Sequence, residues 1–239
     1  MAASRSSIEK LVKLIKGGFS GTGKLPVYEE RVVIIHSPFK TGTTTIAGAL
    51  VVMGFADMDH GFHRDLNRAY KPQIDKANRL AIKFDSFEAF RSKRGKKVIT
   101  LMQGLLEHTE GYKIFGDVPF GHLRIHPFVK KLIMPNARFI WIDRDEDAWF
   151  KSAQKWHLAH PEIYPGADKS WAENPAGEKR KLIRLRENGF KEFRKLQKVF
   201  PEDCLVISLE KDAQWQPLCD FLNLPVPTAK FPVLNKAKA

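Results

Sequence analysis

Residues 32–55 constrain the fold more than any other part of this chain, because they combine a buried strand, a tight turn and a helix. The apolar run VVII leads into the turn HSPFKTG, and a helix is expected to begin beside Gly42. A turn rich in small and hydroxyl residues, followed by a helix, directs backbone N–H groups and the positive end of the helix dipole toward one point. The segment therefore predicts a binding site for an anion.

The turn differs from the Walker A loop of nucleoside triphosphatases where that loop contacts a triphosphate. A Walker A loop has glycine, four residues and then Gly-Lys-Ser/Thr, and its lysine reaches the β and γ phosphates. Here Ser37 replaces the first glycine and Thr43 replaces the lysine, while the turn carries Lys40 two residues before Gly42. A lysine in the turn is placed beside a single terminal group, which disfavours a P-loop-type kinase.

The segment Lys40-Thr41-Gly42-Thr43-Thr44 resembles the 5′-phosphosulfate loop of sulfotransferases that use 3′-phosphoadenosine 5′-phosphosulfate (PAPS). The family pattern is Pro-Lys-Ser/Thr/Ala-Gly-Thr-Thr, whereas Phe39 here separates proline from lysine. Position 45 carries threonine where many relatives have tryptophan or serine. The resemblance implies these residues for the 5′-phosphosulfate: Lys40, Thr41, Gly42, Thr43, Thr44 and Thr45.

A second segment, residues 137–152, resembles the 3′-phosphate motif of the same family. The apolar run ARFIWI is readable as an inner strand, ends at Asp143-Arg144, and is followed eight residues later by Ser152. An arginine at the strand end and a hydroxyl two helical turns later can grip one phosphate from two sides. The resemblance assigns Arg144 and Ser152 to the 3′-phosphate.

The C-terminal segment also resembles small sulfotransferases related to P-loop proteins. Their signature has a tryptophan, Pro-Leu-Cys, Phe-Leu, Phe-Pro and an asparagine. The matching residues are Trp215, Pro217, Leu218, Cys219, Phe221, Leu222, Phe231, Pro232 and Asn235. The three segments together frame residues 32–235 and imply PAPS as the sulfuryl donor, with 3′-phosphoadenosine 5′-phosphate as its product.

Sulfuryl transfer needs a cation near the leaving oxygen and a base for the acceptor proton. Lys40 is the expected cation. For the base we favour Asp117, because cytosolic sulfotransferases have a histidine, one residue and a proline at the corresponding strand end, where this chain has Asp117-Val118-Pro119. An ordinary aspartate is a weak base, so His60 and His63 are rival acceptor-site residues.

The order of elements predicts an α/β fold of three layers, with a mainly parallel central sheet flanked by helices, as in the P-loop-like fold of sulfotransferases. We expect an N-terminal helix and linker over residues 1–30 and a single sulfotransferase domain over residues 31–239. The expected strands are residues 31–36, 112–115, 137–143 and 204–209. The expected helices are residues 43–53, 123–133, 145–159, 176–199 and 215–222, with a basic helical stretch interrupted at Pro72 and Gly95.

Because ligands bind at the carboxyl ends of parallel strands, Lys40, Asp117 and Arg144 are expected at one edge of the sheet. His36, inside the first strand, is expected to be a core histidine with its hydrogen bonds satisfied, and Trp149 is expected in the core. The histidine pairs lack a nearby carboxylate or cysteine in a recognisable ligand set, so no metal site is expected.

The net charge of +13 is compatible with a polyanion-binding protein, but no nucleic-acid-binding motif accompanies it, and an anionic cofactor would equally favour a positive field. We therefore expect no nucleic-acid partner. Residues 7–18 form an amphipathic basic helix that either packs on the domain or contacts a membrane surface. No apolar run reaches the roughly 20 residues needed to span a bilayer, and no secretory segment is recognisable, so a cytoplasmic protein is expected.

The sequence thus favours a PAPS-dependent sulfotransferase that acts on a hydroxyl of a small molecule, lipid or sugar. The alternatives are a P-loop-type kinase and a non-catalytic nucleotide- or polyanion-binding protein. Neither the acceptor nor the oligomeric state follows from the sequence.

Overall fold

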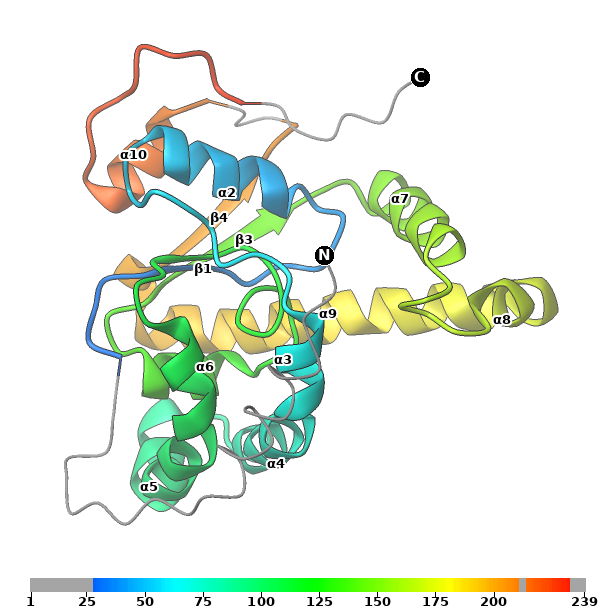
Figure 1. Cartoon of the computed structure of the whole chain (residues 1–239), viewed down its shortest axis with the longest axis horizontal. Coiled ribbons are helices and arrows are strands. Elements are labelled where there is room, and N and C mark those ends of the chain that lie inside the picture. The colour runs from blue at the N-terminus through cyan, green and yellow to red at the C-terminus, as the bar shows by residue number, and fades with distance from the viewer. Residues whose placement is uncertain (1–27, 211–213, 233–239) are drawn as a thin grey trace, which may run out of the picture.

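A parallel sheet organises the part of the chain that the computed structural model describes, residues 28–210 and 214–232 (Figure 1). Its strands are β1 (Val33–Ile35), β2 (Ile114–Phe115), β3 (Arg138–Asp143) and β4 (Cys204–Ser208), in the order β2-β1-β3-β4. All three pairings are parallel, with Ile34 opposite Phe139 and Ile142 opposite Ile207. The expected α/β fold with a parallel sheet is therefore confirmed.

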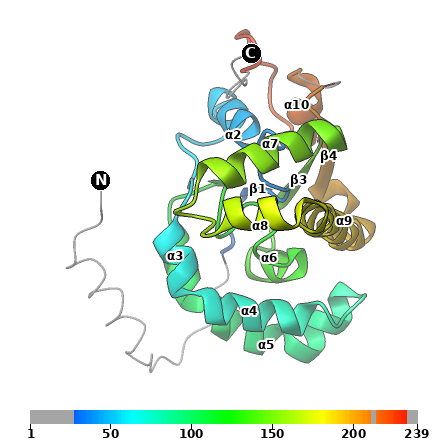
Figure 2. The same cartoon turned by 90° about the vertical axis from the view of Figure 1, so that its right-hand side faces the viewer.

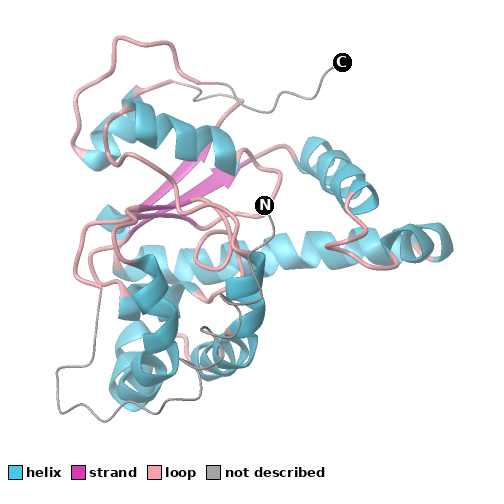
Figure 3. Cartoon of the chain, in the orientation of Figure 1, coloured by secondary structure: helices cyan, strands magenta, loops and turns pink. Residues whose placement is uncertain are grey.

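The inner strands are apolar on both faces because each face is covered by helices. Val33 and Ile35 point into one core with α2 (Thr43–Val52) and α10 (Gln216–Leu222). Ile34 points into a second, larger core on the opposite face. Helices lie on both sides of the strands in Figure 3, which gives the three layers.

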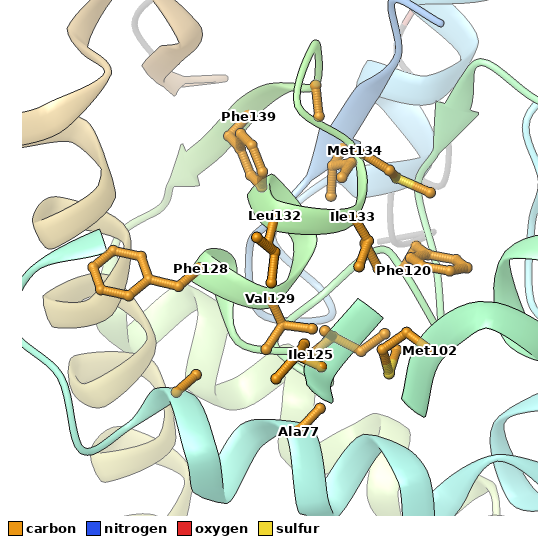
Figure 4. Packing of buried hydrophobic residues seen from close by; sticks show 14 of the residues in the cluster. Ala77, Met102, Phe120, Ile125, Phe128, Val129, Leu132, Ile133, Met134 and Phe139 are labelled. Carbon is orange, nitrogen blue, oxygen red and sulfur yellow. The ribbon is translucent and has the colours of Figure 1, made fainter. Parts of the chain in front are cut away.

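The second core joins the sheet to α6 (Pro127–Ile133) and α9 (Pro175–Val199), and continues to α4 (Lys71–Ala81) and α5 (Phe87–Leu106). In Figure 2, α4 and α5 lie beyond α6 on the side away from the sheet. Figure 4 shows the contact region, in which Leu132 and Val129 of α6 lie between Phe139 of β3 and Ala77 of α4. Every residue of α6 is buried, which is unusual for a helix of seven residues that includes two lysines.

The remaining elements are α3 (Arg64–Ala69), α7 (Glu146–Ala159), α8 (Ala167–Glu173) and the 3-10 helices η1 (Glu107–Thr109) and η2 (Pro201–Asp203). In Figure 1, α7 and α8 lie beyond the ends of β1 and β3, beside α9. None of the helices in residues 28–210 and 214–232 is long and apolar enough to cross a membrane.

Several expectations about the helices need correction. Gly95 does not interrupt α5; it is buried within that helix, where an added Cβ would make an ordinary contact with Leu132. Pro72 lies in the first turn of α4, so it begins that helix. α8 was not expected, and α6 begins only at Pro127 because residues 119–126 form turns.

The predicted helix over residues 7–18 lies outside the described residues, as does most of the proposed segment 1–30.

Candidate active site

The turn between β1 and α2 has the backbone geometry of an anion-binding loop. Gly42 precedes α2 with φ +108°, and a Cβ at this position would overlap the side chain of Leu209. Glycine is therefore required both for its conformation and for the close approach. As the N-cap, Gly42 offers no side chain to the first-turn N–H groups of α2, so that backbone edge can serve a ligand.

Ser37 connects this loop to the neighbouring strand β3 through hydrogen bonds. Its hydroxyl donates to the carbonyl of Ile142 at 3.0 Å and accepts from the N–H of Ile142 at 3.1 Å. The hydroxyl of Thr41 donates to the carbonyl of Pro38 at 2.7 Å and lies 3.1 Å from the Ser37 hydroxyl. The side chain of Thr41 is thus engaged inside the loop, which leaves its backbone as the part that can face a ligand.

Lys40 adopts φ +64° and is half-buried, with its ammonium 4.5 Å from the centre of the Trp156 ring. Burial, and then the charge of Arg144, lower the pKa of the Lys40 ammonium. Arg144 also donates from Nη1 to the backbone carbonyl of Lys40 at 2.6 Å. The two motifs recognised in the sequence are therefore in direct contact.

Arg144 follows the last residue of β3, and its Nε lies 3.9 Å from Oε1 of Glu210, beyond the end of β4. Its backbone carbonyl accepts from Arg186 of α9, which also pairs with Asp143 at 3.0 Å. Arg144 is thereby held between the sheet edge and α9, with its guanidinium directed to the loop.

A cavity of about 1340 Å³ opens at this edge of the sheet. Its walls come from the loop, the residues after β2 and β3, and α7. It brings together all the residues that the sequence assigned to the cofactor and the favoured base: Lys40, Thr41, Gly42, Thr43, Thr44, Thr45, Asp117, Arg144 and Ser152. Thr44 is exposed toward the cavity, whereas Thr43 and Thr45 are mostly buried.

Comparison with protein families matches residues 32–197 and 167–239 to the model of a sulfotransferase domain. This chain belongs to the sulfotransferase family. A search of curated proteins found no match. The matched ranges contain every residue that lines the cavity, and family membership supports sulfotransferase activity in general.

The sulfotransferase cavity does not include His60 or His63 among its lining residues. The ring of His60 is buried against Tyr112 and Phe115, with centroid distances of 4.8 Å and 5.3 Å. Burial, and then the nearby His63, lower the pKa of His60 to about 4. His63 approaches the carbonyl of His60 through Nε2 at 2.7 Å. His60 is therefore buried outside the cavity lining, whereas His63 is exposed.

Asp117 lines the cavity with a side chain that is 36% exposed. Its Oδ1 accepts from the N–H of Val118 at 2.7 Å and lies 3.2 Å from Nε2 of His122. Burial raises the pKa of Asp117, but the hydrogen bond and charge of His122 and the N–H of Val118 together lower it further, so its pKa lies below the usual value. Asp117 is therefore ionised at neutral pH.

His122 is the site residue that sequence reasoning missed. It also lines the cavity, has φ +51°, and places Nδ1 3.1 Å from the carbonyl of Ser37. One ring nitrogen thus faces a backbone carbonyl oxygen and the other faces the carboxylate of Asp117. His126, four residues further on, does not join His122 at the cavity; its Nε2 lies 3.1 Å from Oε2 of Glu192.

An aromatic cluster of Phe39, His157 and Tyr164 forms part of the cavity wall. Phe39 stacks on His157 with a centroid distance of 5.3 Å, and His157 lies 4.0 Å from the ring of Tyr164. Trp149, as expected, is fully buried below this cluster, and its Nε1 donates to the carbonyl of Phe39 at 2.8 Å. The cluster gives the polar loop an apolar neighbour on the side of α7.

No group of three or more histidine, cysteine, aspartate or glutamate side chains within residues 28–210 and 214–232 could hold a metal ion. Cys204 and Cys219 are free and buried.

Proposed function

We propose that this sulfotransferase moves a sulfuryl group from PAPS to a hydroxyl of a small molecule, lipid or sugar. The observation that carries the proposal is the single cavity that joins the loop of residues 40–45, Arg144, Ser152 and Asp117. These residues come from three strand ends and one helix, and each supplies a function that the reaction needs.

The residues present fit a donor with a phosphosulfate and a separate phosphate. The open first turn of α2 and the bare Gly42 suit an anion that approaches the backbone closely. Arg144 and Ser152 lie on the same wall and suit a second anion. PAPS, the usual donor of the family, supplies the activated sulfuryl group.

In the proposed reaction, a bond forms between the acceptor oxygen and sulfur while the bond between sulfur and the phosphate oxygen breaks. The leaving phosphate gains negative charge, which the ammonium of Lys40 neutralises after leaving the face of Trp156. The N–H groups of the first turn of α2 hold the equatorial oxygens. The acceptor proton passes to the carboxylate of Asp117.

His122 supports this role by holding Asp117 ionised and oriented toward the cavity. A carboxylate with a lowered pKa is a modest base. The assignment therefore favours acceptors whose hydroxyl loses its proton late in the reaction, when its oxygen is already bonding to sulfur.

Two alternatives predict different binding and turnover. A P-loop-type kinase would need a lysine at position 43, where Thr43 is buried at the start of α2, and it would turn over ATP with magnesium. A non-catalytic nucleotide- or polyanion-binding protein would bind 3′-phosphoadenosine 5′-phosphate without transferring sulfate.

The test begins with calorimetric titration of the protein with 3′-phosphoadenosine 5′-phosphate, with ATP and adenosine 5′-phosphate as controls. Micromolar binding that requires the 3′-phosphate is expected. Labelled PAPS is then offered with a panel of phenols, alkyl alcohols, sterols and sugars. Equal binding of ATP, or transfer to none of the panel, would contradict the proposal.

The matched variants are Lys40→Met and Lys155→Met, since Lys155 is an exposed lysine on α7. Turnover should fall by about 10³-fold or more in Lys40→Met and stay near wild type in Lys155→Met. Nucleotide binding should fall far less than turnover in Lys40→Met, which separates an enzyme from a simple binder.

A further inference from the structure

Lys130 of α6 is a fully buried lysine without a carboxylate partner. Its side chain has no exposed surface, and no carboxylate in residues 28–210 and 214–232 lies within ion-pairing distance of its Nζ. The neighbouring Lys131 is almost as buried, but it pairs with Asp203 at 2.7 Å. The two adjacent lysines are thus buried in different ways, and of the two only Lys131 forms an ion pair.

The contacts of Lys130 fit an uncharged amine. Nζ lies 2.8 Å from Nδ1 of His36 and donates to the backbone carbonyl of His122 at 2.8 Å. A neutral amine has two N–H bonds, and an unprotonated Nδ1 and this carbonyl are acceptors for both. Burial lowers the pKa of Lys130 well below its usual value, which agrees with this geometry.

In this arrangement His36 is neutral and carries its proton on Nε2, so that Nδ1 accepts from Lys130. The buried Nε2 has no hydrogen-bond partner among the described residues, so the expectation that His36 is fully satisfied is wrong for this atom. Burial lowers the pKa of His36 well below its usual value, which agrees with a neutral ring. An apolar pair would fill the same space without an unsatisfied group.

The polar pair contacts the active site through a single group, the carbonyl of His122. The N–H of His122 donates to the carbonyl of Ile35 at 2.9 Å, so both backbone groups of this residue are fixed. Between these two bonds His122 takes its left-handed conformation, which aims the imidazole at Asp117. Lys130 itself does not line the cavity.

We propose that Lys130 is a positioning residue for the Asp117–His122 pair, and that His36 accepts its second hydrogen so that the amine can stay buried and uncharged. The proposal rests on the proposed function in that it assigns Asp117 to the acceptor proton. The groups that face Lys130 are His36, which directly follows β1, His122 from the turn before α6, and His126 at the start of α6, which in turn pairs with Glu192 of α9.

The test uses the full chain with nitrogen-15 labelled histidine and long-range proton–nitrogen spectra of the imidazole rings. In the wild type, His36 should show the tautomer with the proton on Nε2, and the His122 signals should change on Asp117→Asn. In Lys130→Met the His122 signals should shift and lose most of their response to Asp117→Asn. Turnover should fall at least about tenfold, with the affinity for 3′-phosphoadenosine 5′-phosphate within about threefold of wild type.

Two controls separate positioning from loss of core packing. Lys131→Met removes a buried lysine from the same helix, away from the cavity, and should leave the His122 signals unchanged. His36→Leu leaves a buried N–H of Lys130 unpaired but keeps its bond to His122, so it should lower the melting temperature and keep most of the turnover.

A wild-type His36 that carries its proton on Nδ1, or is doubly protonated, would overturn the proposal even if Lys130→Met did not fold. Unchanged His122 signals in folded Lys130→Met, or equal losses of turnover in Lys130→Met and His36→Leu, would overturn it as well. Failure of the wild type to bind 3′-phosphoadenosine 5′-phosphate would instead count against the proposed function, because the imidazole spectra need no ligand.

Discussion

The guanidinium of Arg144 donates to the backbone carbonyl of Lys40 at 2.6 Å and so joins two motifs that lie 104 residues apart in the chain. This hydrogen bond lies within the protein and needs no ligand. Arg144 therefore acts in two ways: it stabilises the loop that ends in Gly42, and its other guanidinium N–H groups remain available to the cavity. Changes at Arg144 should reach both ends of a bound donor.

Arg144→Ala should weaken binding of 3′-phosphoadenosine 5′-phosphate by roughly 10- to 100-fold, the effect of a lost charge-assisted hydrogen bond. Binding of adenosine 5′-phosphate should weaken too, because the loop loses its support at the Lys40 carbonyl. Calorimetric titration measures both. Arg194→Ala, on the exposed face of α9, is the control and should change neither affinity. An Arg144→Ala variant that binds 3′-phosphoadenosine 5′-phosphate with wild-type affinity would show that Arg144 does not bind the nucleotide.

Gly42→Ala should abolish nucleotide binding and lower the free energy of unfolding by roughly 1 to 3 kcal/mol, because the new Cβ meets Leu209 at a positive φ. Gly54 is the matched control, with φ +73° and open space around it. Gly54→Ala should show only the smaller cost of backbone strain and bind normally. Denaturant unfolding and titration distinguish the two. Similar behaviour of both variants would mean that Leu209 moves aside freely.

Asp117→Asn should reduce turnover by about 10²- to 10⁴-fold, the usual contribution of a general base, with little change in nucleotide affinity. Asp59 supplies the comparison: its carboxylate accepts from the N–H of Gly116 at 2.7 Å, and it does not line the cavity. Asp59→Asn should keep turnover within about threefold of wild type. The assay uses labelled PAPS and an acceptor identified from the panel. Equal activity of Asp117→Asn and wild type would leave the acceptor proton to another group.

His60 should make folding stability fall with acid between pH 6.5 and about 4. The folded protein keeps His60 neutral down to about pH 4, whereas the unfolded chain binds the proton from about pH 6.5, so the unfolded state gains protons first. Stability is thus present above this window and is lost as the pH falls through it.

Melting temperatures of wild type and His60→Gln across this range test the linkage. The variant should lose less stability on acidification, by roughly 3 °C or more, although it starts lower at pH 7 because a buried ring is lost. Parallel melting curves for the two proteins would show that His60 titrates normally.

The sequence predicted the parallel sheet and the two motifs because these depend on local patterns. The continuous apolar run before Ser37 indicated a strand buried on both faces, and the glycine of the turn indicated where α2 begins. The strand that ends just before Arg144 was predicted from the same kind of apolar run. Their meeting at one sheet edge followed from the rule that parallel strands present their carboxyl ends together.

The acceptor side was less predictable, because its contacts join segments without a pattern. His122 reaches Asp117 through a turn with positive φ, for which a histidine gives no local signal. Nothing in the sequence distinguishes Lys130 from a solvated helix lysine, and only the structure shows that every residue of α6 is buried. His60 was expected at the acceptor but is buried outside the cavity lining, because Tyr112 and Phe115 close around it.

The two cores on opposite faces of the sheet have a consequence for protein engineering. The donor loop continues into α2, which packs in one core, while the cavity residues Asn78 and Leu123 belong to segments supported by the other. Under the proposed function, libraries randomised at the cavity-lining residues Phe62, Asn78 and Leu123 should alter acceptor preference without changing the core that holds α2. Variants selected for altered acceptor preference should bind 3′-phosphoadenosine 5′-phosphate with the affinity of the wild type.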